Sequence, residues 1–293
     1  MARRLDPVCS CVVLASLAAI VTTHALRPST PAQQGAPRRV GDPLIDWISP
    51  LTMSALSPIA HILGAAGVSA NTVTGVSLVA GVLAGAALAL GHFGVAVLAT
   101  TVAFLGDAMD GLLARHMHTA SPGGALFDAS ADRYEEFFVL GGLALFFRSS
   151  PGVLAIALLA MVGSFMVSYG SAMAEAHGVP VPGGIMRRAS RAAILAAGIT
   201  LVPITAAVAR SASGFAWLTY SPALLALAVI AVGANVSAVI RLRVVAHAAS
   251  RRPATAYLPK SALRGSRPIR ASTTRTVSSE SSLSSAHACD SLP

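Results

Sequence analysis

Six apolar segments dominate the sequence and constrain its fold more than any other feature. They run near 72–90, 93–115, 124–147, 152–176, 188–208 and 220–243, and short stretches rich in glycine, serine and proline separate them. Each segment is long enough to cross the hydrocarbon core of a bilayer as a helix. The composition agrees, because 54% of the 293 residues are hydrophobic and only 11% are charged. We therefore predict an all-α integral membrane protein with six transmembrane helices.

Three regions follow from this pattern, and they cover residues 1–42, 43–247 and 248–293. The first holds an apolar run and a linker; a cleaved signal, a membrane anchor, an interfacial segment and a misassigned start codon all fit it. The second is the membrane domain, and it opens with an amphipathic helix expected to lie along the membrane interface over 43–66. The third is basic, rich in serine and without apolar periodicity, which predicts disorder.

The positive charges indicate the orientation of the membrane domain. With the six segments as spans, one side carries Arg38, Arg39, Arg115, Arg187, Arg188, Arg191, Arg241 and Arg243, and the other carries only Arg148 and Arg210. The side richer in arginine is predicted to be cytoplasmic. A net charge of +9 also suits an anionic lipid surface. No nucleic-acid-binding module is recognised, so we predict the bilayer and no nucleic acid as a partner.

Acidic residues gather at the junction between the second and third segments. The chain has 12 of them, and six fall between positions 107 and 136, namely Asp107, Asp110, Asp128, Asp132, Glu135 and Glu136. An aspartate at the centre of a membrane helix costs about 2.5–3.5 kcal/mol on insertion, and neighbouring carboxylates also repel one another. A bound divalent cation would offset both costs.

The spacing of these carboxylates supports a shared site. Asp107 and Asp110 lie on one face of one helix, whereas Gly124, Asp128 and Asp132 lie on one face of the next. Two antiparallel helices joined by a turn over 115–123 would direct both faces to one pocket. Carboxylate oxygens without histidine or cysteine favour Mg²⁺ or Mn²⁺ over Zn²⁺.

The same stretch resembles the signature of the CDP-alcohol phosphotransferases, D-x2-D-G-x2-A-R-x8-G-x3-D-x3-D, at all eight positions. The matching residues are Asp107, Asp110, Gly111, Ala114, Arg115, Gly124, Asp128 and Asp132. The resemblance implies a six-helix, homodimeric membrane enzyme of phospholipid biosynthesis, in a bacterial inner or cell membrane. Its expected reaction displaces CMP from CDP-diacylglycerol with a polar alcohol acceptor.

The resemblance also implies roles for the signature residues. A two-metal site with Mg²⁺ or Mn²⁺ would involve Asp107, Asp110, Asp128 and Asp132, and Asp132 would also be the general base. The CDP moiety would lie against Gly111, Ala114, Arg115 and Gly124. Glu136 extends the stripe of Asp128 and Asp132 by another turn; it either supports the site or pairs with Arg133, and we favour the pair.

A second stretch, from Tyr169 to Arg191, is similar to the branch of the family that uses inositol phosphate. Three arginines (Arg187, Arg188 and Arg191) are candidates for binding the acceptor phosphate by charge-assisted hydrogen bonds. The stretch departs from the pattern at Met173, where an arginine is expected, and at Ser190, where an acidic residue is usual. Inositol phosphate is therefore the favoured acceptor and glycerol phosphate the next, while the arginines also suit a role as cytoplasmic membrane anchors.

A second class of function stays open at this point. A non-catalytic six-helix protein, or a transporter-like scaffold, could keep the aspartates to bind a divalent cation. Metal-dependent release of CMP separates this alternative from the enzyme.

Overall fold

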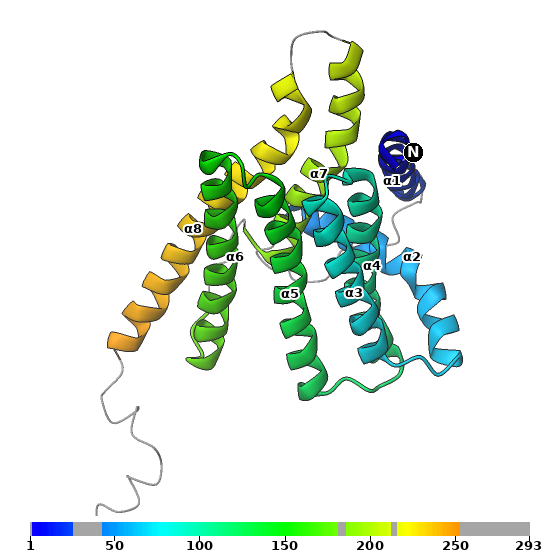
Figure 1. Ribbon diagram of the computed structural model, residues 1–293. Coiled ribbons are helices and arrows are strands. Elements are labelled where there is room, and N and C mark those ends of the chain that lie inside the picture. Colours follow the sequence, from blue (N-terminus) through cyan, green and yellow to red (C-terminus); the bar gives the residue numbers. More distant parts are fainter. Residues whose placement is uncertain (1, 26–42, 181–185, 212–215, 252–293) are drawn as a thin grey trace, which may run out of the picture. The chain divides into compact units, whose positions relative to one another are not determined.

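The computed structural model describes residues 2–25, 43–180, 186–211 and 216–251, and it is helical throughout its regular elements. Figure 1 shows the helices in chain order. Their bounds are α1 Ala2–Ala25, α2 Pro43–Ala65, α3 Ala70–Ala89, α4 Phe93–His116, α5 Pro122–Phe146, α6 Pro151–Ala176, α7 Arg188–Ser211 and α8 Ser221–Ser250, with a short 3-10 helix, η2, at Ala216–Tyr220. The six predicted segments correspond to α3 through α8, so the all-α prediction is confirmed.

The apolar character of these helices is that of an integral membrane protein. Among the described residues, five helices are long and apolar enough to cross a bilayer: α3, α4, α6, α7 and the stretch that contains α8. Helix α5 is not one of the five, and it carries Asp128, Asp132, Arg133, Glu135 and Glu136 within its 25 residues. The sixth crossing therefore stays a prediction.

Two serine caps define where the helices around the acidic cluster begin. The Ser69 hydroxyl accepts a hydrogen bond from the Thr72 amide at 3.2 Å and caps α3. The Ser121 hydroxyl accepts one from the Gly124 amide at 3.1 Å, and Pro122 occupies the first turn of α5. Both arrangements satisfy amides that a helix start leaves without partners. They fix the first turns of the two helices at the same end of the bundle as the carboxylates.

Helix α3 holds the two aspartate-bearing helices in position. It packs extensively against both α4 and α5, whereas α4 and α5 barely contact each other. The close approach depends on small residues, because a Cβ added to Gly85 would collide with the carbonyl of Phe138 and one on Gly142 with the carbonyl of Gly85. Gly106 of α4 makes a similar approach to Ser77 of α3. The predicted antiparallel pair therefore exists, but α3 aligns it.

The other half of the bundle is built on α8. Helix α8 packs chiefly against α6 and also against α7, and the main hydrophobic core runs through all three into α3 and α5. Its fully buried members include Leu88, Leu140, Leu143, Ile199, Leu227 and Ile230. Leucine and isoleucine fill this core, while alanine and glycine occupy the places where helices approach most closely. The result is a rigid frame on which α5 and α7 present their charges.

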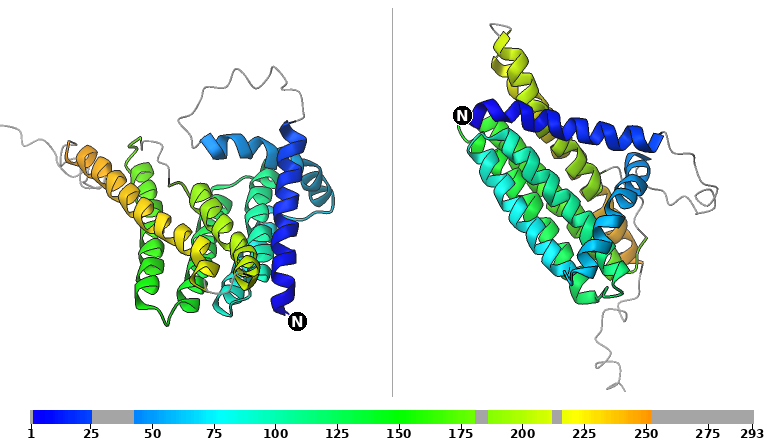
Figure 2. Two further views of the ribbon diagram at one scale, coloured as in Figure 1. Left: turned by 90° about the horizontal axis from the view of Figure 1, so that it is seen from above. Right: turned by 90° about the vertical axis from the view of Figure 1, so that its right-hand side faces the viewer.

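The N-terminal region contributes a helix to this frame. Helix α1 lies along α4 and α7 (Figure 2), with Val13 in the main core. The buried Asp6 carboxylate accepts a hydrogen bond from the Gly94 amide at 3.2 Å, in the first turn of α4. His92, the residue at the N-cap of α4, makes no capping bond with its side chain, so Asp6 supplies the missing acceptor.

The remaining predictions about the ends of the chain are met only in part. Residues 43–65 form the expected helix α2, which packs on α4 through Leu56, Ala60 and Met109. Its position at a membrane interface stays a prediction. The linker at 26–42 and the tail from 252 onward lie outside the described residues, and α8 runs to Ser250.

Candidate active site

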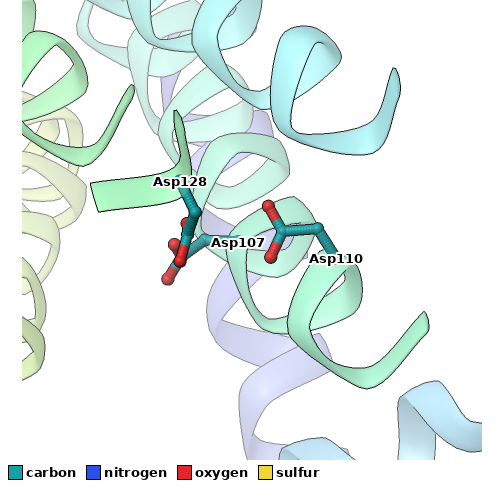
Figure 3. Close-up of side chains that lie close together, drawn as sticks. All are labelled: Asp107, Asp110 and Asp128. Atoms are coloured by element: carbon teal, nitrogen blue, oxygen red, sulfur yellow. The ribbon is translucent and has the colours of Figure 1, made fainter. Parts of the chain in front are cut away.

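Three carboxylates converge between α4 and α5 (Figure 3). Asp107 and Asp110 come from adjacent turns of α4 and Asp128 from α5, and ligand oxygens from the three lie within 4.8 Å of one another. Asp110 is buried, with 4% of its surface exposed, and Asp107 and Asp128 are half-buried. The Oδ1 atom of Asp128 is buried without a hydrogen-bond partner. Convergent oxygens with an unsatisfied acceptor fit a divalent cation, as the sequence predicts.

A threonine on α3 orients one of these carboxylates. The Thr74 hydroxyl donates a hydrogen bond to Asp110 Oδ2, and the two oxygens are 2.6 Å apart. A partner of this kind fixes which oxygen faces the metal site and holds the carboxylate rotamer. Sequence reasoning assigned Thr74 no role. The available signal was its place one turn inside the start of α3, as a hydroxyl residue in an apolar segment.

A cavity of about 390 Å³ opens beside the carboxylates. All four residues predicted to contact CDP line it, namely Gly111, Ala114, Arg115 and Gly124, and Asp110 and Asp128 form part of its wall. Polar side chains from the start of α3, among them Ser69 and Asn71, also line it. The small residues leave space close to the backbone, and Arg115 is exposed near the rim. The cavity is therefore continuous with the group of three carboxylates.

Asp132 lies next to this group of three carboxylates but is not one of them. Its Oδ1 atom lies 2.6 Å from Nη2 of Arg188, and its Oδ2 atom lies 3.4 Å from Nη1 of Arg133. It lines a second, smaller cavity of about 70 Å³ together with Glu135, Glu136 and Arg188. Asp132 is thus outside the group of three but close enough to interact with Asp107 and Asp128, and it lies beside an arginine.

The three predicted acceptor arginines have different surroundings. Arg188 contacts Asp107, Asp132 and Glu135. Arg191 is 1% exposed and forms a two-pronged ion pair with Glu136, at 2.7 Å from Nε to Oε1 and 2.8 Å from Nη2 to Oε2. Arg187, just before α7, is exposed.

The pairing of Glu136 corrects one prediction. We expected Glu136 to pair with Arg133, but Glu136 pairs with Arg191, and Arg133 lies on Asp132 instead. The planar guanidinium of Arg191 matches both oxygens of the carboxylate, and its Nη1 also donates to the Met186 carbonyl at 2.9 Å. The buried guanidinium of Arg191 makes three hydrogen bonds, two of them to Glu136. This arrangement is more favourable for Glu136 than a contact with the half-exposed Arg133 on the same helix.

Sequence reasoning counted Arg241 only as a topological charge, yet it is a buried arginine without an acidic partner among the described residues. It is 8% exposed, its Nη1 donates to the Ser171 hydroxyl, and its Nε is buried without a hydrogen-bond partner. No described acidic side chain lies within ion-pair distance of it, and the charges of Arg191 and Arg187 act on it from nearby. A charge inside an apolar segment was the signal that could have found it.

Comparison with known proteins gives this geometry a context. The family model described as CDP-alcohol phosphatidyltransferase matches residues 67–232, more than half of the chain. An uncharacterised protein of Aquifex aeolicus is 32% identical over 157 residues, which cover 53% of this chain and 80% of that protein. Phosphatidylinositol phosphate synthases of Mycobacteroides abscessus and Streptomyces avermitilis are 34% and 33% identical over 48% and 47% of this chain. The match covers slightly less than two thirds of these synthases, 66% and 59% of their lengths.

Solved structures with the same arrangement of helices include two of a phosphatidylinositol phosphate synthase from Mycobacterium tuberculosis. One holds CDP-DAG; it is 27% identical, has a TM-score of 0.55 and covers 66% of this chain and 92% of its own. The other is a complex with manganese and citrate; it is 26% identical, has a TM-score of 0.56 and covers 64% of this chain and 87% of its own.

Proposed function

This chain belongs to the CDP-alcohol phosphatidyltransferase family, and we propose that it transfers the phosphatidyl group of CDP-diacylglycerol to a polar alcohol with release of CMP. The observation that carries the proposal is the convergence of the signature residues. Six of the eight line one cavity, and the other two, Asp107 and Asp132, lie beside it and share one guanidinium. The family match and the named synthases favour this enzyme over a non-catalytic cation-binding protein.

The carboxylates on α4 and α5 suit binding of Mg²⁺ or Mn²⁺ by Asp107, Asp110 and Asp128. Ions bound there would neutralise the diphosphate of the CDP-linked lipid and favour displacement at phosphorus. The CDP moiety would occupy the cavity of about 390 Å³, against Gly111 and Gly124. Arg115 near its rim is available to the diphosphate.

The chemical step needs a base for the acceptor hydroxyl, and we assign this role to Asp132. The acceptor oxygen forms a bond to the phosphorus that carries diacylglycerol, the bond from that phosphorus to the CMP oxygen breaks, and the hydroxyl proton passes to Asp132. Support comes from its position one helical turn beyond Asp128, with its carboxylate beside a guanidinium that also contacts Asp107. Direct contact between Asp132 and a metal ion stays a prediction.

We further propose that the acceptor carries a phosphate, with inositol phosphate favoured and glycerol phosphate next. The support is the excess of positive charge near the start of α7, where the exposed Arg187 and the buried Arg241 act on each other electrostatically. A buried arginine without a carboxylate partner is costly unless an anion offsets it. Arg191 is held by Glu136, so we assign it to support this region, whereas Arg187, Arg188 and Arg241 are the candidates for contact with the phosphate.

The test is release of CMP by the purified full chain with CDP-diacylglycerol and Mn²⁺ or Mg²⁺, against inositol phosphate, glycerol phosphate, inositol and serine. We expect release with inositol phosphate only, and none from Asp107→Asn. Release with glycerol phosphate alone would keep the enzyme class and change the acceptor. No release with any acceptor would contradict the proposed function.

We also propose the cellular setting: a bacterial inner or cell membrane, a homodimer, and an active site on the cytoplasmic side. Arginines at the carboxylate end (Arg115, Arg187, Arg188, Arg191, Arg241 and Arg243) outnumber those at the opposite end (Arg148 and Arg210), which supports the orientation. His118→Cys, in a chain with its native cysteines replaced by serine, should react with a membrane-impermeant maleimide only from the cytoplasmic side. Chemical cross-linking in native membranes should trap a dimer.

A further inference from the structure

One arginine connects the carboxylates of α4 to those of α5. Arg188, the first residue of α7, places Nη1 at 2.7 Å from Asp107 Oδ2. Its Nη2 lies 2.6 Å from Asp132 Oδ1 and 3.2 Å from Glu135 Oε2. The side chain is 28% exposed, so this charge lies among the carboxylates rather than in open solvent. Arg188 therefore neutralises part of the group that the metal ions would also neutralise.

Two cations then compete for one carboxylate. Asp107 belongs to the group of three aspartates and is at the same time the partner of Arg188 Nη1. A divalent ion and a guanidinium held on the same carboxylate repel each other, and the repulsion is strong where water screens it poorly. Full metal binding is thus opposed by the contact between Arg188 and Asp107.

Glu135 offers the guanidinium a place that no metal needs. Its carboxylate contacts Arg188 but is outside the group of three aspartates. The side chain is buried and packs against α3, where a Cβ added to Gly81 would come within 2.9 Å of the Glu135 Cγ. A carboxylate packed in this way has little freedom to move away from Arg188. Glu135 can retain Arg188 after a metal ion has bound Asp107.

We propose that Arg188 is a resident counter-ion which divalent cations displace from Asp107, and that Glu135 is the carboxylate that retains it near the site. The next step rests on the proposed function: once Arg188 has left Asp107, its Nη1 is free to bind the acceptor phosphate. Metal ions and acceptor would then bind with positive coupling, and each would raise the affinity for the other by the same factor. In this scheme Glu135 is a positioning residue, because it acts through Arg188, whereas Arg188 itself contacts the acceptor.

The test is the affinity of the full chain in detergent for Mn²⁺ alone, measured by electron paramagnetic resonance without any substrate. Arg188→Gln should bind Mn²⁺ more tightly, by about 5–10-fold, at the lower end of common coupling factors. Glu135→Gln should bind it more weakly, because Arg188 then stays on Asp107 and Asp132. In the double variant the effect of Glu135→Gln should largely disappear, which separates competition from a simple loss of negative charge.

A matched control comes from the same helix as Asp132. Arg133→Gln removes an equal charge from a residue that contacts Asp132 at 3.4 Å and forms no ion pair with Asp107, and it should change Mn²⁺ affinity much less than Arg188→Gln. Arg188→Lys keeps the charge but loses the fork, so it should tighten Mn²⁺ binding less than Arg188→Gln. It also serves if Arg188→Gln does not fold.

Thermal unfolding provides a second readout. Arg188→Gln should unfold at a lower temperature than the native chain without metal, and Mn²⁺ should raise its unfolding temperature by more than that of the native chain. Unchanged or weaker Mn²⁺ binding by folded Arg188 variants would overturn the inference, whatever the transferase assay gives. Competition for Mn²⁺ in a chain that releases no CMP would support the inference and refute the proposed function.

Discussion

The charges at the functional end of the bundle form two groups that are neutralised in opposite ways. On α4 and α5 lie five carboxylates, and three of them (Asp107, Asp132 and Glu135) contact the guanidinium of Arg188. Arg133 contacts Asp132, whereas Asp110 and Asp128 have no ion pair among the described residues. Near the start of α7 and the end of α8, Arg191 has the single carboxylate of Glu136, and Arg241 has no acidic partner among the described residues. One group has excess negative charge and the other excess positive charge.

This difference indicates how two phosphate-bearing substrates would be held. The acidic group needs cations, and bound cations would in turn attract a diphosphate. The basic group needs an anion and can bind a phosphate directly through N–H donors. If this division is correct, substitutions in the first group should affect metal binding or turnover, and those in the second should affect acceptor binding or stability.

The largest effect is expected within the acidic group, at Asp132. Asp132→Asn removes the proposed base and should lower turnover about 10²–10⁴-fold, the usual range for general base catalysis. Mn²⁺ binding should stay largely in place, with a loss no greater than that in Glu135→Gln because Asp132 also holds Arg188, whereas Asp107→Asn should lose both. The check is CMP release and Mn²⁺ titration on the same preparations. Equal loss of Mn²⁺ binding in both variants would make Asp132 a metal ligand.

The next effect concerns the one neutralised pair of the basic group. Glu136→Gln leaves Arg191 buried with its charge uncompensated, which should lower the free energy of unfolding by about 3–5 kcal/mol. Unfolding in detergent, followed by circular dichroism, measures it. Glu175→Gln, at an exposed carboxylate on α6, is the control and should be nearly neutral. A small change for Glu136→Gln would mean that the ion pair does not hold α5 to α7.

A smaller and more selective effect is expected at Arg241. Arg241→Met removes a buried charge, so folding should not suffer, but loss of a charged hydrogen bond to the acceptor should raise its KM about 10–100-fold. The KM for CDP-diacylglycerol should stay the same. Arg243→Met, at an exposed position two residues further along α8, is the matched control. An unchanged acceptor KM would remove Arg241 from the acceptor site.

The smallest effect concerns the orientation of Asp110 within the acidic group. Thr74→Val removes the hydrogen bond to Asp110 and should weaken Mn²⁺ binding about 10-fold, the lower end for groups that orient a metal ligand. Thr74→Ser should restore most of the affinity because it keeps the hydroxyl. If Thr74→Ser is as weak as Thr74→Val, the methyl group and packing of Thr74 would matter more than its hydrogen bond.

Local features of the fold were predictable because they depend on the chain over a few residues. The apolar segments matched α3 through α8, with the largest difference at the end of α8, which runs seven residues beyond the predicted 243. The convergence of Asp107, Asp110 and Asp128 followed from helical spacing and one turn. Periodicity and breakers such as Gly91 act through backbone geometry, which short stretches of sequence determine.

The pairing of charges was decided only by the tertiary structure. The contact between Arg188 and Asp107 joins residues 81 apart in sequence, that between Arg191 and Glu136 joins residues 55 apart, and that between Arg241 and Ser171 joins residues 70 apart. The spacing of residues within one helix does not show which residue on another helix each charged side chain will contact. The packing of the helices determines the partners. Glycine contacts bring α3 against both α4 and α5, and α8 packs against α6 and α7.

The sequence by itself thus determined a helical membrane protein with a carboxylate site of a recognisable kind. Only the tertiary structure decided that Arg188 contacts Asp107 of that site, that Glu136 pairs with Arg191, and that Arg241 has no acidic partner among the described residues. The physical reason is one of range. Helix formation and face patterning are local and nearly independent of the rest of the chain, whereas the partner of a buried charge depends on which side chains the packed helices bring within about 3 Å of it.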